Sequence, residues 1–365
     1  MSAASLEPAI APPAIPPAGG SVRALAHSLV KTPLNAAITL ACAGILAWLL
    51  PGLVEWALLK ARWDGGAALC RAPDAGACWS FVIEKMRFMA FGFYPFAEQW
   101  RPLAAIGLLA ATLATGLFPS LRNWAYLCCL PLLFAAMYVL MAGGILGLLP
   151  VATRQWGGIP LTLMLSVFGI ALALPIAILL ALGRQSSYPL LRLMCIGYIE
   201  IVRGVPLIGL IFMATNMLPL FLPAGFNLDQ VLRAQAAMLC FAAAYLAEVV
   251  RAGLQAVPRG QAEAATSLGL GYWKTVAFVI LPQALRVATP ALVSTVIGLF
   301  KDTSLVIIVG LTEFFGAARV ATSDPKWLGF DVEAYVFAAL VYFCFCKAIA
   351  GYGRYLERRA ATARA

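Results

Sequence analysis

Long apolar runs recur along this 365-residue chain, and they constrain its fold more than any other feature. A helix needs about 20 mostly apolar residues to cross a bilayer. Hydrophobic residues make up 62% of the sequence and charged residues 12%, which is about half of the charged fraction usual in globular proteins. We therefore predict an all-α polytopic membrane protein with about eight transmembrane helices. The predicted spans lie near residues 34–58, 103–119, 124–149, 159–182, 205–222, 236–250, 290–311 and 332–349.

Basic residues outnumber acidic ones, 26 to 16, and most of them lie at the ends of the apolar runs. This distribution argues against nucleic acid as a partner and agrees with the tendency of cytoplasmic loops to collect Lys and Arg beside a lipid bilayer. With eight spans, the basic segments 183–204 and 251–289 and both termini fall on one side, which we predict to be the cytoplasm. The segment 60–100 disagrees, because it carries several basic residues and the same topology places it outside.

Polar segments flank and interrupt the apolar runs. Residues 1–33, which begin with an Ala- and Pro-rich stretch, predict a disordered cytoplasmic tail, and residues 358–365 predict a basic cytoplasmic tail. The predicted periplasmic loop at about 60–100 holds Cys70 and Cys78. Since such a loop faces an oxidising compartment, we predict a disulfide between these two cysteines, with two free thiols as the alternative. The nine cysteines form no metal-binding pattern.

A polar segment with the sequence EAATSLGLGYWKTVAFVILP, residues 263–282, stands between two long apolar runs. Small residues permit the close approach of a partner surface, and glycine permits a backbone turn that other residues resist. We predict two short helices broken by a turn at 269–271, and the alternative is an ordinary amphipathic helix at the membrane interface. We expect the functional residues of this segment to be Glu263, Ala264, Ala265 and Gly269.

The spacing of this segment resembles the cytoplasmic coupling loop of ABC importer permeases: Glu-Ala-Ala, three residues, Gly, nine residues, an aliphatic residue, one residue and Leu-Pro. Other segments are similar to polar amino-acid ABC transporter permeases in the same order along the chain, with small departures such as Val279 before Leu-Pro and Ala252 after Arg251. The chain most resembles the M-type permease subunit of general L-amino-acid ABC importers. The segments that carry the resemblance are 157–184, 198–212, 244–265 and 281–305.

The resemblance implies a type I ABC importer permease core of five helices, residues 157–357, with its coupling loop at about 256–282. Residues 34–156 then form an N-terminal extension with three transmembrane helices. The implied function is that of the permease subunit of an ATP-driven amino-acid importer in a bacterial inner membrane, working by alternating access. The implied partners are a second related permease, two ABC ATPase subunits and a periplasmic amino-acid-binding protein.

We expect no catalysis and no cofactor in this chain, and the resemblance implies that ATP binds the partner subunits. A phosphate loop requires Gly immediately before its Lys, whereas Trp273 precedes Lys274. Two other functional classes remain open. An ion-gradient secondary transporter would show internal repeats, which the sequence lacks. A structural membrane subunit would not need ionisable residues at bilayer depth.

Such ionisable residues occur in the predicted span 290–311, where Lys301 and Asp302 are followed by Thr303 and Ser304. A charged residue at bilayer depth costs about 2.5–3.5 kcal/mol on insertion scales and marks a functional site by default. Adjacent residues do not face each other on a helix, so each charge needs another partner. We predict that these four residues serve the substrate or the gate, and a structural ion pair is the equal alternative. We expect Glu200, Arg203 and Glu248 to anchor the cytoplasmic ends of the spans.

Overall fold

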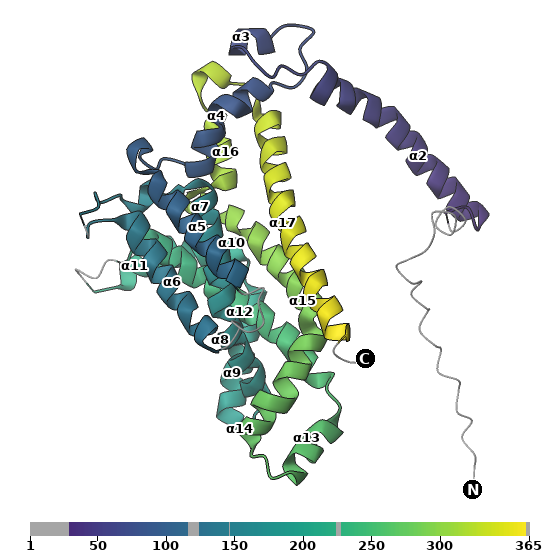
Figure 1. Cartoon of the computed structure of the whole chain (residues 1–365), viewed down its shortest axis with the longest axis vertical. Coiled ribbons are helices and arrows are strands. Elements are labelled where there is room, and N and C mark those ends of the chain that lie inside the picture. The colour runs from purple at the N-terminus through teal and green to yellow at the C-terminus, as the bar shows by residue number, and fades with distance from the viewer. Residues whose placement is uncertain (1–28, 116–123, 146, 224–227, 363–365) are drawn as a thin grey trace. The chain divides into compact units, whose positions relative to one another are not determined.

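The computed structural model describes residues 29–115, 124–145, 147–223 and 228–362 (Figure 1). The chain divides into two compact units, Met1–Cys78 and Trp79–Ala365, and each is described by itself. The predicted disordered tail at 1–33 lies mostly outside the described residues. The predicted boundary between residues 156 and 157 stays a prediction, because it falls inside the second unit.

The first unit is built on one long apolar helix. Helix α2, Pro33–Val54, begins after Thr32, whose side chain accepts a hydrogen bond from the backbone N–H of Asn35 at 3.2 Å, and it continues into a π-helical turn at Glu55–Leu59. None of its residues is buried within the unit, as expected for a helix that faces lipid. It corresponds to the predicted span 34–58. The short helix α3, Ala67–Cys70, follows.

The second unit is a bundle of helices (Figure 1). Helix α8 packs along α12, α12 packs against α15, and α15 packs against α17. Small side chains make the first contact close, because Ala173, Ala177 and Ala181 form a fully buried stripe on α8. The bounds of these helices are α8 Gly169–Arg184, α12 Gln230–Gln255, α15 Leu281–Lys301 and α17 Asp331–Thr362.

Among the described residues, five helices are long and apolar enough to cross a membrane, and a bent pair could supply a sixth. The pair is α9, Pro189–Gly204, followed by Leu207–Phe221, with a bend of 101° between them. Helices α5, Trp100–Thr115, and α6, Trp124–Ala142, occupy two further predicted spans but are shorter. The all-α polytopic fold is therefore confirmed, whereas the count of eight spans is not.

Two segments that the sequence analysis placed between membrane spans contain helices. Most of 183–204 is the helix α9, in which charged residues interrupt the apolar run. The polar segment 60–100 contains α4, Trp79–Phe91, whose buried face includes Phe81 and Met89. Helix α4 packs against α16, Phe314–Ala321. Ion pairs scattered along both segments raised their polarity and masked the helical period.

Candidate functional site

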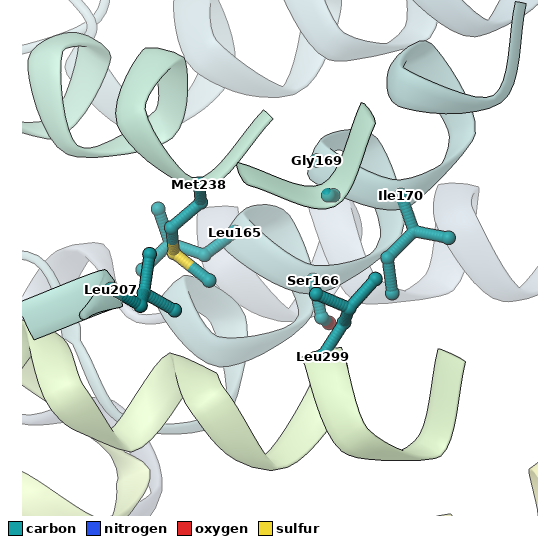
Figure 2. A pocket seen from close by; sticks show the side chains of 8 residues that line it. Leu165, Ser166, Gly169, Ile170, Leu207, Met238 and Leu299 are labelled. Atoms are coloured by element: carbon teal, nitrogen blue, oxygen red, sulfur yellow. The ribbon is translucent and has the colours of Figure 1, made fainter. Parts of the chain in front are cut away.

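Three helical breaks lie around one small cavity in the second unit (Figure 2). The side chain of Leu299 points from α15 toward Ser166, and Met238 of α12 lies beside Leu165 and Leu207 (Figure 2). The cavity volume is about 10 Å³, which is room for one water molecule, and the cavity is partly open to its surroundings. An amino acid does not fit into it as it stands. The lining residues are Leu165, Ser166, Gly169, Ile170, Leu207, Met238, Ala242 and Leu299.

Each break has a local cause or a distinct geometry. A π-helical turn at Met164–Phe168 joins α7, Gly158–Leu163, to α8, and such turns are frequent at functional sites. Val205 is extended (φ −101°, ψ 134°) because the following Pro206 disfavours helical geometry. This interruption separates α9 from α10, Leu207–Phe212. Helix α15 gives way to a 3₁₀ segment at Asp302–Val309. Leu207 and Leu299 bring the last two breaks to the cavity wall.

The residues predicted to serve the substrate or the gate lie at the third break. Lys301 is the last residue of α15 and is exposed, and Asp302 begins the 3₁₀ segment and is partly buried. Neither forms an ion pair with another residue of the described ranges. Thr303 is fully buried and donates a hydrogen bond to the Phe300 carbonyl at 2.8 Å, whereas Ser304 donates to the Lys301 carbonyl at 2.9 Å. The structure thus separates the two charges from the buried hydroxyl of Thr303.

Thr303 instead connects through Tyr342 to a buried carboxylate, Glu313, that the sequence did not single out. The Thr303 and Tyr342 hydroxyls lie 3.3 Å apart, and the Tyr342 hydroxyl donates to Glu313 at 2.9 Å. Glu313 is 0% exposed and caps α16 by accepting from the backbone N–H groups of Phe315 at 2.8 Å and Gly316 at 2.7 Å. Burial raises the pKa of the Glu313 carboxyl, and these hydrogen bonds oppose the rise. An acidic residue directly before an apolar helix was the available signal.

Glu248 of α12 connects three helices through ion pairs. Its carboxylate accepts from Arg184 Nη1 of α8 at 2.6 Å and from Arg251 Nε and Nη2 at 3.0 and 2.9 Å. Arg184 also binds Glu200 of α9 at 3.0 Å, and Arg203 lies 3.9 Å from Glu248. The predicted anchors therefore form one charge network that fixes α8, α9 and α12 to one another. The sequence predicted Glu200, Arg203 and Glu248 as separate anchors and not that they share one network.

The predicted coupling loop folds as two short helices, α13, Arg259–Ser267, and α14, Tyr272–Thr275. They lie at the end of the bundle opposite α4 and α16 (Figure 1). Gly269 has a left-handed conformation, φ +77°. Its N–H binds the Thr266 carbonyl at 2.9 Å, and the Leu270 N–H binds the Ala265 carbonyl at 3.1 Å. This pattern is a Schellman motif, which favours glycine at the left-handed position.

The loop presents a mixed surface to its surroundings. Glu263 and Ala264 are exposed, whereas Ala265 is 3% exposed and packs against its own chain. Leu268 is 81% exposed, and Tyr272 and Trp273 are also exposed, with their rings in edge contact. These three side chains, which we call the loop apolar patch, are uncovered within the chain.

In the first unit, Cys70 and Cys78 form a disulfide, with their Cα atoms 5.5 Å apart. Backbone hydrogen bonds hold the intervening segment against the end of the π-helical turn: the Arg62 N–H binds the Ala77 carbonyl, and the Ala77 N–H binds the Trp56 carbonyl, both at 2.8 Å. Across the described part of both units, no three His, Cys, Asp or Glu side chains gather as a metal site.

Comparisons with known proteins match nearly the whole chain. The family model for "binding-protein-dependent transport system inner membrane component" matches residues 173–362. The inner membrane amino-acid ABC transporter permease protein YhdY of Escherichia coli (strain K12) is 47% identical over 337 residues, which are 90% of each protein. The glutamate/glutamine/aspartate/asparagine transport system permease protein BztC of Rhodobacter capsulatus is 37% identical and covers 93% of this chain and 94% of its own. The glutamate/aspartate import permease protein GltK of Escherichia coli O6:H1 is 34% identical; 92% of it matches only 56% of this chain.

Proposed function

We propose, from the premise that this chain belongs to the family of binding-protein-dependent transport system inner membrane components, that it is the permease subunit of an ATP-driven amino-acid importer. The family model covers residues 173–362, and two relatives named as amino-acid permeases align along at least 90% of the chain. The substrate class comes from those names. The relative BztC suggests glutamate, glutamine, aspartate and asparagine as the first amino acids to test.

The coupling loop is the observation that carries this proposal. A permease that receives work from a separate ATPase needs an ordered surface outside the bilayer, and α13 and α14 provide one at a single end of the bundle. The loop apolar patch of Leu268, Tyr272 and Trp273 is uncovered, and aromatic residues are enriched in the cores of protein interfaces. We propose that an ABC ATPase subunit covers this patch, with Glu263 and Ala264 beside it and Gly269 setting the turn.

The place of the cavity among interrupted helices supports alternating access. Substrate sites of transporters commonly lie where membrane helices are discontinuous, and the wall of this cavity includes residues from all three broken helices. Breaks can absorb a change of direction without unfolding either half of the helix. We propose that the cavity opens when ATPase motion reaches it, and that Lys301 and Asp302 at the third break contact the substrate or the gate during this opening.

The remaining partners and the orientation follow from the same proposal. A second related permease would face this chain across the pathway, two ATPase subunits would bind the coupling loops, and a periplasmic amino-acid-binding protein would deliver substrate at the end that holds α4 and α16. Both termini and the coupling loop would then be cytoplasmic. Arg259 and Lys274 within the loop agree with this side, because cytoplasmic segments are enriched in basic residues.

The test is uptake by the reconstituted complex. Vesicles that contain this chain, its co-purified subunits and the binding protein should accumulate a tritiated amino acid of the four named above only when ATP is inside them with the ATPase subunits. Matched vesicles without the ATPase subunits should accumulate none. Uptake that an ion gradient drives in those control vesicles would instead identify a secondary transporter.

A further inference from the structure

Gln235 places a buried polar side chain close to the small cavity, and the proposed function assigns it no role. The residue lies on α12, where positions 235, 238 and 242 share one helical face, and Met238 and Ala242 line the cavity. Its side chain is buried, with 5% of the residue exposed. The Nε2 group donates a hydrogen bond to the Leu165 carbonyl at 3.2 Å. The Oε1 atom is buried and has no hydrogen-bond partner within the described part of the chain.

The chemistry of the contact fixes which amide atom is left over. Leu165 offers a carbonyl oxygen, which can only accept, so the Gln235 amide must turn its NH₂ group toward it. The opposite orientation would place two carbonyl oxygens against each other. Leu165 belongs to the π-helical turn at Met164–Phe168, and the Gly169 N–H also binds this carbonyl. The first helical break therefore holds the amide so that its acceptor atom remains unpaired.

The amide also lies against the wall of the cavity. A Cβ atom on Gly169 would meet Gln235 Nε2 at 3.0 Å, and Gly169 itself lines the cavity. Of the eight lining residues, only Ser166 carries a polar side chain, and its hydroxyl donates to the Thr162 carbonyl at 2.8 Å. Gln235 lies behind this lining and is not part of it, and its Oε1 is the buried acceptor without a partner next to the cavity wall.

We propose that Gln235 Oε1 accepts a hydrogen bond from the α-ammonium group of the transported amino acid when the cavity opens. This inference rests on the proposed function. A buried carbonyl oxygen without a donor is costly, and a charged donor forms the stronger hydrogen bond. The α-carboxylate cannot take this place, because it has no proton to donate. The ammonium group is common to the amino acids of this class, so the contact selects for the class and not for one member.

The experiment compares Gln235→Met and Gln235→Glu with a matched control in the reconstituted complex. Gln230→Met serves as the control, because Gln230 lies on the same helix and its Nε2 also donates to a backbone carbonyl, that of Val309. The readout is the amount of tritiated L-glutamate, L-glutamine, L-aspartate or L-asparagine accumulated per ATP hydrolysed, beside the melting temperature of the complex. Both methionine variants lose one donated bond, but only Gln235→Met removes the unpaired acceptor.

Gln235→Met should lower uptake per ATP at least about tenfold, the factor that corresponds to one hydrogen bond to a charged group. Gln230→Met should keep it within about twofold. Gln235→Glu retains an acceptor oxygen but loses the donor to the Leu165 carbonyl, so its uptake should lie between that of the wild type and that of Gln235→Met. Equal uptake per ATP in Gln235→Met and the wild type overturns the inference, as does uptake in Gln235→Glu that is no higher than in Gln235→Met. If Gln235→Met fails to assemble, complete loss of uptake in an assembled Gln235→Glu complex overturns the inference. A wild-type complex that takes up no amino acid in an ATP-dependent manner refutes the proposed function itself.

Discussion

Gly269 offers a direct test of how the coupling loop works, because substitutions there can separate the effect of backbone strain from the effect of side-chain bulk against a partner. The residue occupies the left-handed region at φ +77°, and a Cβ atom there would meet nothing within 4 Å. Replacement by Ala therefore costs only backbone strain, about 1–2 kcal/mol, which shifts the equilibrium between ordered and frayed loop about 5- to 30-fold. Asn tolerates the left-handed region better than Ala, and Asp adds a carboxylate at the negative end of α13.

The three substitutions rank differently under the two mechanisms. If an ATPase surface closes over the turn, the bulk of the side chain decides, and both Gly269→Asn and Gly269→Asp should abolish ATP-driven uptake while Gly269→Ala retains part of it. If only the order of the loop matters, Gly269→Ala should be the most damaging and Gly269→Asn the least. We expect the first ranking, with normal membrane insertion in every variant.

The assay is uptake into vesicles together with the yield of ATPase subunits on affinity purification. Gly329→Ala is the matched control, since Gly329 also has a left-handed conformation, φ +98°, with nothing within 4 Å of its Cβ position. It follows the segment Pro325–Trp327, away from the coupling loop, and should carry the same strain with full uptake. Normal uptake in a stably expressed Gly269→Asp variant would show that the turn does not face the ATPase.

Three further predictions concern the rest of the chain. Mass spectrometry of alkylated but unreduced protein should find Cys70 and Cys78 unlabelled, and full labelling of both would refute the bridge. Glu248→Gln should lower the free energy of unfolding by about 1–3 kcal/mol, measured by thermal melting, because it weakens hydrogen bonds from two arginines; an unchanged melting temperature would contradict this. Lys301→Met should lower transport more than assembly, and restored uptake in the double variant with Asp302→Asn would assign the two charges a structural role.

The sequence predicted those structural features that depend on residues close together in the chain. The apolar run at 34–58 and the glycine turn at 269–271 both appear as expected, because helix length and left-handed geometry depend on nearby residues. The helix α9 was missed since its charges satisfy partners elsewhere: Arg203 approaches Glu248 of α12, which is distant in sequence. Such a pairing has no local signal.

Local patterns in the sequence also did not predict how the helical breaks meet at the cavity or that Gln235 has an unpaired acceptor oxygen. Pro206 predicts an interruption, but not that the chain continues at 101° and delivers Leu207 to a cavity wall. The unpaired oxygen of Gln235 depends on a carbonyl 70 residues earlier in the chain. In the sequence, a single Gln in an apolar run predicts no functional role. Only the fold shows which of its side-chain atoms has a hydrogen-bond partner.

The two helices that enclose the coupling loop both reach the cavity, and this connects the proposed sites mechanically. Helix α12 ends at Gln255 and carries Met238 about 25 Å away along its axis, while α15 begins at Leu281 and carries Leu299. Near the loop the two helices are tightly apposed, since a Cβ on Gly253 would lie 2.6 Å from the Ala284 carbonyl. We therefore expect a displacement at the loop to move both helices together there, because the backbones approach closely at Gly253. The three breaks lie at the far end, around the cavity, where α7, α10 and the 3₁₀ segment can change direction. Under the proposed function, the loop end of α12 and α15 would receive the force of the ATPase, and the cavity end is where the walls would separate.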